Sequence, residues 1–359
     1  MSQRVKDILV DDFWIMPATP EYKDDGIPYI TSKNIKNGII DFTKVNYISQ
    51  EAYNSISRNR PILVGDILIS MIGTLGETAE VKESYGSFYG QNMFLVRINE
   101  NKVNKRYFLD FFKSSSVKRA LEGKQNQSTQ KYLKANHIED LTIPMLKLDE
   151  QKLIAEQLDK LSYIIKLRTD ELKKLDELIK ARFVEMFGDK GYPVLKWKDV
   201  FNTTTGKLDS NAAVEDGEYP FFTCSKEALR IDKFAYDQEA LLLAGNNAAG
   251  KYDVKYYKGK FNAYQRTYIL DLKESWSYQL FRYQLEDKLA YLQQQSLGGL
   301  TKYLTMKILG KLEFIVPPID KQMEFEQFVY QVDKSKVAVQ KALDETKLLF
   351  DSLMQKYFG

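Results

Sequence analysis

Apolar side chains recur at alternating steps of four and three residues in two stretches of the chain. This spacing is typical of the seam between two coiled-coil helices, because it keeps the apolar side chains on one stripe. Eight of the ten stripe positions are apolar in each stretch, and neither stretch contains proline. We predict long helices over 150–187 and 321–358. The stripes are Ile154, Leu158, Leu161, Ile165, Arg168, Leu172, Leu175, Ile179, Arg182 and Met186, then Phe325, Val329, Val332, Lys336, Val339, Leu343, Thr346, Phe350, Leu353 and Tyr357.

Charged residues mark the start of each predicted helix and interrupt each apolar stripe. Each helix opens on an aspartate, Asp149 or Asp320, whose carboxylate can accept hydrogen bonds from N–H groups of the first turn. Arg168 and Lys336 interrupt the two stripes in the same heptad, either to fix the register or to extend into water. If the helices pair with each other we expect them to run antiparallel; the alternative is that each packs on its own domain.

The segments outside the helices predict mixed strand and loop. Short apolar runs bounded by turn residues indicate strands at 67–69, 93–98, 241–243 and 267–270. Shorter helices are expected at 106–121 and 277–292. The segment 188–193 contains two glycines and a proline and predicts a linker. It separates a first domain at 1–149 and its helix from a second domain at 194–320.

The chain also repeats itself at a constant offset of 171 residues. Lys131-Tyr132-Leu133 recurs as Lys302-Tyr303-Leu304, Asp149 as Asp320, Gln151 as Gln322, and Phe187-Gly188 as Phe358-Gly359. The constant offset indicates two like modules related by an approximate twofold axis. The predicted fold class is therefore α+β, with two pseudo-twofold-related strand-rich domains joined by two long antiparallel coiled-coil helices. A twofold protein suits a twofold partner such as duplex DNA.

Composition narrows the choice of function class. A chain of 359 residues with 44% hydrophobic content can form two globular cores. The single cysteine, Cys224, excludes an internal disulfide framework and a multi-cysteine metal site. No apolar leader or apolar stretch of about 20 residues occurs, so we expect no membrane association and a cytoplasmic location. The net charge of +3 permits a local basic groove without requiring one.

Several segments resemble the DNA specificity subunits of type I restriction-modification systems. In the first repeat these are the runs Gly26 to Gly38 and Val64 to Ser70, and Ile143-Pro144 leading into Asp149-Glu150-Gln151. In the second they are Thr205-Gly206-Lys207, Glu218 to Phe221, and Val316 to Gln322. The entry to each helix departs from the family pattern, with Pro144-Met145 for a proline pair and Lys321 for an acid. The resemblance covers essentially the whole chain.

The resemblance implies a non-catalytic subunit whose two target recognition domains each read one half of a split site in double-stranded DNA. It further implies two methyltransferase subunits docked on the helices, which would bind S-adenosylmethionine and methylate adenine. Restriction subunits, where present, would use ATP with Mg²⁺. No cofactor or metal would be bound by this chain itself.

Two equivalent polar loops precede the repeated Lys-Tyr-Leu sequence. Amide side chains can pair with adenine edges and lysines can neutralise phosphates, so these loops suit a DNA groove, although an ordinary solvated loop has the same composition. The candidates are Lys124, Gln125, Asn126, Gln127, Ser128, Thr129 and Lys131 in the first loop, and Gln293, Gln294, Gln295 and Lys302 in the second.

Further DNA contacts are predicted from lysines beside tyrosines in the stretch 251–260, although an edge strand protected by lysines gives the same pattern. Polar residues elsewhere in the first repeat, two of them with counterparts in the second, complete the set of predicted DNA contacts. These candidates are Asn246, Asn247, Lys251, Lys255 and Lys258, then Gln91 and Asn92 with their counterparts Gln265 and Arg266, and finally Lys33, Asn34 and Lys36.

Other functions have weaker sequence support. Gly245 to Lys251 matches a phosphate-binding loop up to its lysine, but Tyr252 replaces the magnesium-binding hydroxyl residue and a strand is expected to follow. Asp66, Glu80 and Lys82 imitate the two carboxylates and lysine of a magnesium-dependent nuclease. A coiled-coil scaffold that never contacts DNA is a further alternative. His137 is expected to be structural, and no Asn-Pro-Pro-Tyr methyltransferase signature occurs.

Overall fold

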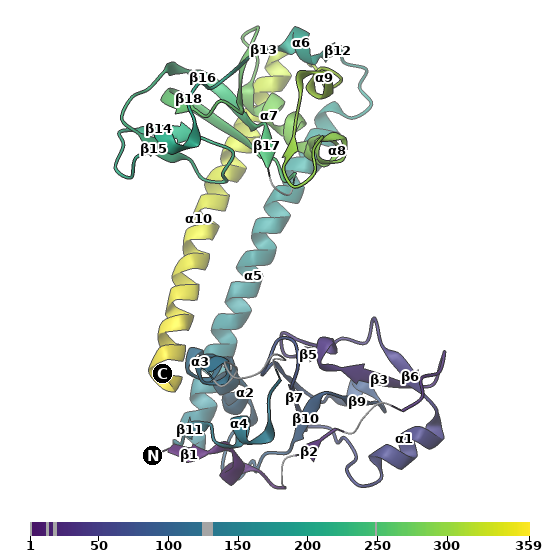
Figure 1. Ribbon diagram of the computed structural model, residues 1–359. Coiled ribbons are helices and arrows are strands. Elements are labelled where there is room, and N and C mark those ends of the chain that lie inside the picture. Colours follow the sequence, from purple (N-terminus) through teal and green to yellow (C-terminus); the bar gives the residue numbers. More distant parts are fainter. Residues whose placement is uncertain (1, 12–13, 17–19, 124–131, 248–249) are drawn as a thin grey trace. The chain divides into compact units, whose positions relative to one another are not determined.

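The computed structural model describes residues 2–11, 14–16, 20–123, 132–247 and 250–359. The chain divides into two compact units (Figure 1). Unit 1 is Met1–Thr169 with Lys341–Gly359, and unit 2 is Asp170–Gln340. Each unit contains a strand-rich domain and a part of both long helices, so neither helix belongs to one domain alone.

The long helices are α5 (Leu148–Phe187) and α10 (Ile319–Phe358). In unit 1 the Arg168 guanidinium donates to the carbonyl of Ala342 and to Thr346 Oγ1. In unit 2 Lys336 Nζ lies 2.6 Å from Asp176 Oδ1. A second contact in each unit gives the direction: Tyr357 OH lies 3.5 Å from Gln157 in unit 1, and Arg182 lies 2.6 Å from Glu324 in unit 2. Within each unit, earlier α5 residues therefore pair with later α10 residues, which confirms that the helices run antiparallel there (Figure 1). The two cations that interrupt the stripes thus connect the helices.

Asp149 and Asp320 lie one position further into the helices than predicted. Each is the second residue of its helix, because α5 begins at Leu148 and α10 at Ile319. At the start of α5 the carboxylate of Glu150, rather than Asp149, accepts a hydrogen bond from the N–H of Lys147 at 3.1 Å. The aspartates still place negative charge in the first helical turn, where the helix dipole favours it.

Unit 1 contains a four-stranded sheet in the order β2-β10-β7-β8 and a three-stranded sheet in the order β6-β3-β9. Strands β3 and β9 run parallel. Two-stranded pairs β1-β11 and β4-β5 complete the described sheets. The strands are β1 (Ser2–Arg4), β2 (Trp14–Ile15), β3 (Ile27–Thr31), β4 (Ile35–Lys36), β5 (Ile39–Ile40), β6 (Asn46–Ile48), β7 (Ile67–Ser70), β8 (Thr78–Glu80), β9 (Tyr89–Gln91), β10 (Met93–Val96) and β11 (Thr142–Pro144).

The helix predicted over 106–121 is two helices. Ser114 has an extended ψ of 153°, and its Oγ accepts from the N–H of Val117, so it ends one helix and begins the next. The short helices of unit 1 are α1 (Gln50–Ser57), α2 (Lys105–Lys113), α3 (Ser115–Gly123) and α4 (Ala135–Glu139), with 3-10 turns η1 (Val5–Ile8), η2 (Ser32–Asn34) and η3 (Glu83–Tyr85).

The last turn of α10 is part of the core of unit 1. The ring of Phe358 lies 4.9 Å from that of Tyr107 and 6.1 Å from that of Phe111, both on α2. Ser116 Oγ on α3 donates to the carbonyl of Phe358 at 2.7 Å. Residues from near both ends of the chain therefore complete one domain.

Unit 2 contains a six-stranded sheet in the order β13-β19-β16-β18-β14-β15 and the pairs β12-β21 and β17-β20. The strands are β12 (Val194–Lys196), β13 (Phe201–Thr205), β14 (Tyr219–Phe222), β15 (Leu229–Ile231), β16 (Tyr236–Ala244), β17 (Asn246–Asn247), β18 (Val254–Ala263), β19 (Thr267–Leu272), β20 (Lys302–Tyr303) and β21 (Glu313–Ile315). The helices are α6 (Trp197–Val200), α7 (Tyr278–Asp287), α8 (Leu289–Gln295) and α9 (Met306–Leu309), with the 3-10 turn η4 (Ser210–Ala212).

The strand order repeats between the units, as the internal duplication predicts. The order β2-β10-β7-β8 corresponds to β13-β19-β16-β18. The parallel pair β3 and β9 corresponds to β14 and β18, and the pair β1-β11 to β12-β21. The predicted short apolar runs thus form the central strands of a sheet with the same strand order in both units. The sequence did not predict which strands pair.

The repeated glutamines explain how each long helix is held on its domain. The buried Gln151 accepts from the N–H of Asn104 at 2.8 Å and donates to the carbonyl of Leu146 at 2.9 Å. The buried Gln322 accepts from the N–H of Ser277 at 3.0 Å and donates to the carbonyl of Pro317 at 2.8 Å. Asn104 and Ser277 are the N-caps of α2 and α7. Each glutamine therefore fixes a long helix against the start of a shorter one.

Candidate nucleic-acid interface

Three loops of unit 2 meet at the end of the central strand β16. Gly245, the residue after β16, donates its N–H to the carbonyl of Arg266 at 2.8 Å, and its own carbonyl accepts from the N–H of Leu304 at 2.8 Å. Asn246 and Asn247 then pair with Tyr303 and Lys302 as β17 and β20. A side chain at Gly245 would place Cβ 2.3 Å from the Arg266 oxygen, so this close approach requires glycine. We call this arrangement the loop junction.

Unit 1 has the same loop junction. Met71, the residue after β7, donates its N–H to the carbonyl of Asn92 at 3.1 Å, and its carbonyl accepts from the N–H of Leu133 at 2.9 Å. Ile72 forms a β-bridge with Tyr132. The junction therefore forms twice from loops that are far apart in the sequence, and in both copies it includes the repeated Tyr-Leu pair.

A small side chain closes each junction from a fourth segment. In unit 1 Ser32 Oγ donates to the carbonyl of Asn92. In unit 2 Cys224 Sγ donates to the carbonyl of Arg266 at 3.7 Å. In each unit one carbonyl, that of Asn92 or of Arg266, therefore accepts two hydrogen bonds. One comes from the backbone N–H of the residue after the central strand, and the other from this small side chain.

The junction of unit 2 brings together most of the residues predicted there. Asn246 and Asn247 are half-buried, whereas Gln265 and Arg266 are exposed in the turn between β18 and β19. Lys302 Nζ donates to the carbonyl of Gly298 at 2.7 Å. A Cβ on Gly250 would lie 3.3 Å from Gln293 Cγ and 3.4 Å from Lys302 Cγ, so these loops are neighbours. Gln293, Gln294 and Gln295 are exposed at the end of α8.

The lysines of the stretch 251–260 have different surroundings. Lys251 is exposed beside the junction. Lys255 Nζ pairs with the carboxylate of Asp253 and donates to the carbonyl of Ser225 at 2.9 Å. Lys258 lies 3.1 Å from Glu239 toward the opposite end of β16 from the junction. The ion pair of Lys255, whose side chain is 17% exposed, weakens the case for its contact with DNA, whereas the Lys258 side chain is 71% exposed. The strand expected after Lys251 is confirmed as β18, and a phosphate-binding loop would instead need a helix there.

In unit 1 the predicted residues are divided. Gln91 and Asn92 lie at the junction, with Asn92 exposed at φ 60°, and Lys33 and Lys36 are exposed. Asn34 is buried, and its amide donates to the carbonyls of Asp41 at 2.8 Å and Lys44 at 3.0 Å. An internal role for Asn34 argues against base contact. Lys124, Gln125, Asn126, Gln127, Ser128, Thr129 and Lys131 lie outside the described residues.

Tyr132 and Tyr303 were not among the predicted contacts, yet they occupy equivalent junction positions. Their side chains are 42% and 39% exposed. The neighbouring Leu133 and Leu304 are buried in the two cores. The repeat itself was the available signal, because alternation along a strand turns the tyrosine outward when the following leucine points inward.

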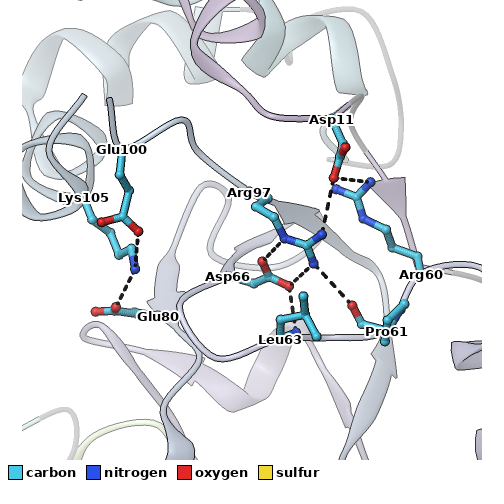
Figure 2. A network of polar contacts seen from close by, with 9 residues as sticks. All are labelled: Asp11, Arg60, Pro61, Leu63, Asp66, Glu80, Arg97, Glu100 and Lys105. Atoms are coloured by element: carbon cyan, nitrogen blue, oxygen red, sulfur yellow. Dashed lines mark hydrogen bonds and ion pairs between the residues drawn. The ribbon is translucent and has the colours of Figure 1, made fainter. Parts of the chain in front are cut away.

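The acidic pair of the nuclease alternative is part of the scaffold (Figure 2). Asp66 is 1% exposed, and its carboxylate accepts from Arg97 Nε at 2.7 Å and Nη2 at 2.9 Å and from the N–H of Leu63 at 2.8 Å. Glu80 pairs with a different cation, Lys105, at 3.2 Å. Both acids therefore already have cationic partners, and Asp66 in particular has no exposed surface for a metal. This arrangement argues against the predicted nuclease set.

Other features of the described residues agree with this interpretation. His137 Nδ1 accepts from the N–H of Lys134 at 3.4 Å in the first turn of α4, a structural contact. Within the described part of the chain, no cluster of three or more histidine, cysteine, aspartate or glutamate residues could hold a metal ion. Nor does any helix among those residues have the length and apolar character needed to cross a membrane.

Comparison with known proteins gives the same family for both halves. The profile of the type I restriction modification DNA specificity domain matches residues 14–177 and 189–346. The EcoDI type I restriction enzyme specificity subunit of Escherichia coli is 48% identical over 94 residues, which are 24% of this chain and 20% of that protein. The StySPI specificity subunit of Salmonella potsdam is 25% identical over 162 residues, 44% of this chain and 34% of that protein. The matches span well under half the length of these curated relatives.

Solved structures share the fold. The type I restriction-modification S subunit of M. genitalium matches with a TM-score of 0.62 at 16% identity, over 100% of this chain and 96% of that one. A chain from a study of the assembly and conformational transition of a type I R-M system matches with a TM-score of 0.58 at 17% identity, over 100% and 97%. The duplicated profile match covers most of the sequence, and this chain therefore belongs to the type I restriction modification DNA specificity domain family.

Proposed function

We propose that this chain is the DNA recognition subunit of a type I restriction-modification complex, in which each strand-rich domain reads one half of a bipartite site. The loop junction carries this proposal. It occurs once in each unit, at the end of the same central strand, with the same backbone hydrogen bonds. Loops supported by a rigid sheet are well suited to hold side chains at a ligand.

The side chains at the junction of unit 2 suit duplex DNA. Asparagine and glutamine can pair bidentately with adenine, and arginine with guanine, whereas lysine neutralises phosphates. Asn246, Arg266 and Gln293 would thus be the base-reading candidates, and Lys302 a phosphate-binding one. In unit 1 Ile72 and Asn92 stand where unit 2 has Asn246 and Arg266. These differences favour different bases in the two half-sites.

The long helices would carry two methyltransferase subunits. Apolar side chains are exposed on these helices outside the seam and would be buried by such partners. The partners would bind S-adenosylmethionine and methylate adenine, and a restriction subunit would add ATP and Mg²⁺ chemistry. This chain would position them on DNA without catalysing a reaction itself, in the cytoplasm. The exposed helix residues include Leu167, Leu178, Val337 and Leu348.

Co-expression with the methyltransferase subunit of the same system tests the proposal. Long-read sequencing of the host genome should then detect methylated adenine in a split motif with a fixed gap. Replacing residues 1–149 by the corresponding domain of a relative should change one half-site and leave the other unchanged. Absence of new methylation, although the partner is soluble and bound, would refute the proposal and favour a scaffold without DNA contact.

A further inference from the structure

The two loop junctions share an exposed tyrosine, although Ile72 and Asn92 of unit 1 stand where unit 2 has Asn246 and Arg266. Tyr132 and Tyr303 each follow a lysine, each bridge the loop after the central strand, and each precede a buried leucine. The cross-strand neighbour of the tyrosine is Ile72 in unit 1 and Asn246 in unit 2. The tyrosine is thus retained where its neighbour has changed.

A group common to two domains that read different half-sites must serve what the half-sites have in common. Base edges differ between half-sites, whereas the sugar-phosphate backbone is the same everywhere. We propose that the phenolic hydroxyls of Tyr132 and Tyr303 each donate a hydrogen bond to a DNA phosphate, one in each half-site. This inference rests on the proposed function. It divides the junction into a shared backbone contact and variable base-reading positions.

The surroundings of the tyrosines fit this role. Within the described residues, neither hydroxyl has a hydrogen-bond partner in the protein, and both side chains are substantially exposed. In contrast, Tyr268 OH, near the same junction, donates to the carbonyl of Leu304 at 3.0 Å and is therefore already satisfied. An exposed hydroxyl is a suitable donor for a phosphate oxygen.

Local packing positions the ring in unit 2. Leu297 and Tyr303 exchange backbone hydrogen bonds of 3.0 and 2.8 Å, which closes a hairpin. A Cβ on Gly298 would lie 3.1 Å from Tyr303 Cδ1, so this glycine leaves space for the ring. A ring held in this way loses little conformational freedom when its hydroxyl binds.

The variants Tyr132→Phe and Tyr303→Phe test the inference, because they remove the hydroxyl and keep the ring. Each would be measured in complex with the methyltransferase, on a duplex with the recognised site and on one lacking it. We expect each variant to weaken both affinities by about tenfold, the effect of one hydrogen bond to a charged acceptor. The ratio of the two affinities and the methylated motif should not change. Tyr85→Phe in unit 1 and Tyr219→Phe in unit 2 supply controls, because these tyrosines lie in the strand-rich domains, outside the junctions and the long helices, where they pack on Phe42 and Phe234.

Three outcomes would overturn the inference. An unchanged affinity in both variants would show that the hydroxyls do not bind DNA, while the proposed function would stand. A loss confined to the recognised duplex, or an altered base in one half-site, would show that the tyrosines read bases. Failure of the unsubstituted complex to bind any DNA would refute the proposed function together with the inference.

Discussion

Substitution of Asp66 by alanine is the sharpest test of whether this residue is structural or catalytic. The side chain is 2% exposed and accepts three hydrogen bonds, two of them from Arg97 (Figure 2). Arg97 lies just after β10 and Asp66 just before β7, so their ion pair connects the ends of two paired strands. Removal of the carboxylate leaves the guanidinium without its main partner.

The cost can be worked out from the contacts. Removing one partner of a buried ion pair costs about 3–5 kcal/mol. Arg97 would keep Asp11 at 3.3 Å and the carbonyl of Pro61 at 3.5 Å, and its side chain is 27% exposed, so the lower figure applies. A free energy of about 3 kcal/mol corresponds to a factor of about 150 in the opening equilibrium of β7 and β10.

Hydrogen–deuterium exchange of peptides from β7 and β10 measures this quantity directly. The control is Glu100→Ala in the same domain, because Glu100 binds Lys105 at 3.1 Å from the surface, with its side chain 65% exposed, and should contribute less than about 1 kcal/mol. Unchanged exchange in Asp66→Ala would refute the structural role. If that variant also lost a magnesium-dependent DNA cleavage shown by the unsubstituted protein, the nuclease interpretation would be restored.

Three further predictions concern single side chains. Gln151→Leu should lower the free energy of unfolding of unit 1 by about 2–4 kcal/mol, and Gln322→Leu should lower that of unit 2 by the same amount, because buried backbone groups lose their hydrogen-bond partners. Urea midpoints equal to those of the unsubstituted chain would contradict this prediction. Burial raises the pKa of Asp110 despite Lys113 nearby, so its stabilising contribution is complete below the ordinary carboxyl pKa and is lost as the pH rises through the folded value. The urea midpoint relative to Asp110→Asn should therefore rise as the pH falls from about 7 to about 4, and a constant difference would exclude the effect. Lys302→Gln should reduce the slope of log affinity against log salt by about 0.9, whereas an identical slope would place this lysine away from phosphates.

The sequence predicts local periodicity and repetition well, and spatial convergence poorly. The long helices follow from apolar spacing, and the duplication from a constant offset. The interruption at Ser114 was missed because the apolar pattern continues across it and only a serine cap marks the break. Lys288, with φ −87° and ψ −4° and no side-chain cap, divides the second predicted short helix into α7 and α8.

The candidate site shows the same division. Asn34 has the residue type of a base-reading group, but its amide supports its own loop, a role that depends on contacts with Asp41 and Lys44. The three loops of a junction meet only because β7 pairs with β10, and β16 with β19, so their proximity is a property of strand order. The repeat identifies Tyr132 and Tyr303 as equivalent positions, whereas the exposure of their side chains is known only from the structure.

The position of Phe358 in the core of unit 1 has a consequence for biosynthesis. Unit 2 is a continuous segment, whereas unit 1 combines Met1–Thr169 with Lys341–Gly359. Domains usually complete folding in the order in which the ribosome makes them. Here the order is reversed, since the first domain synthesised must wait, with its aromatic core around Tyr107 and Phe111 incomplete, until the last turn of α10 has been translated. The second domain, a continuous segment, can therefore close before the core of the first is complete.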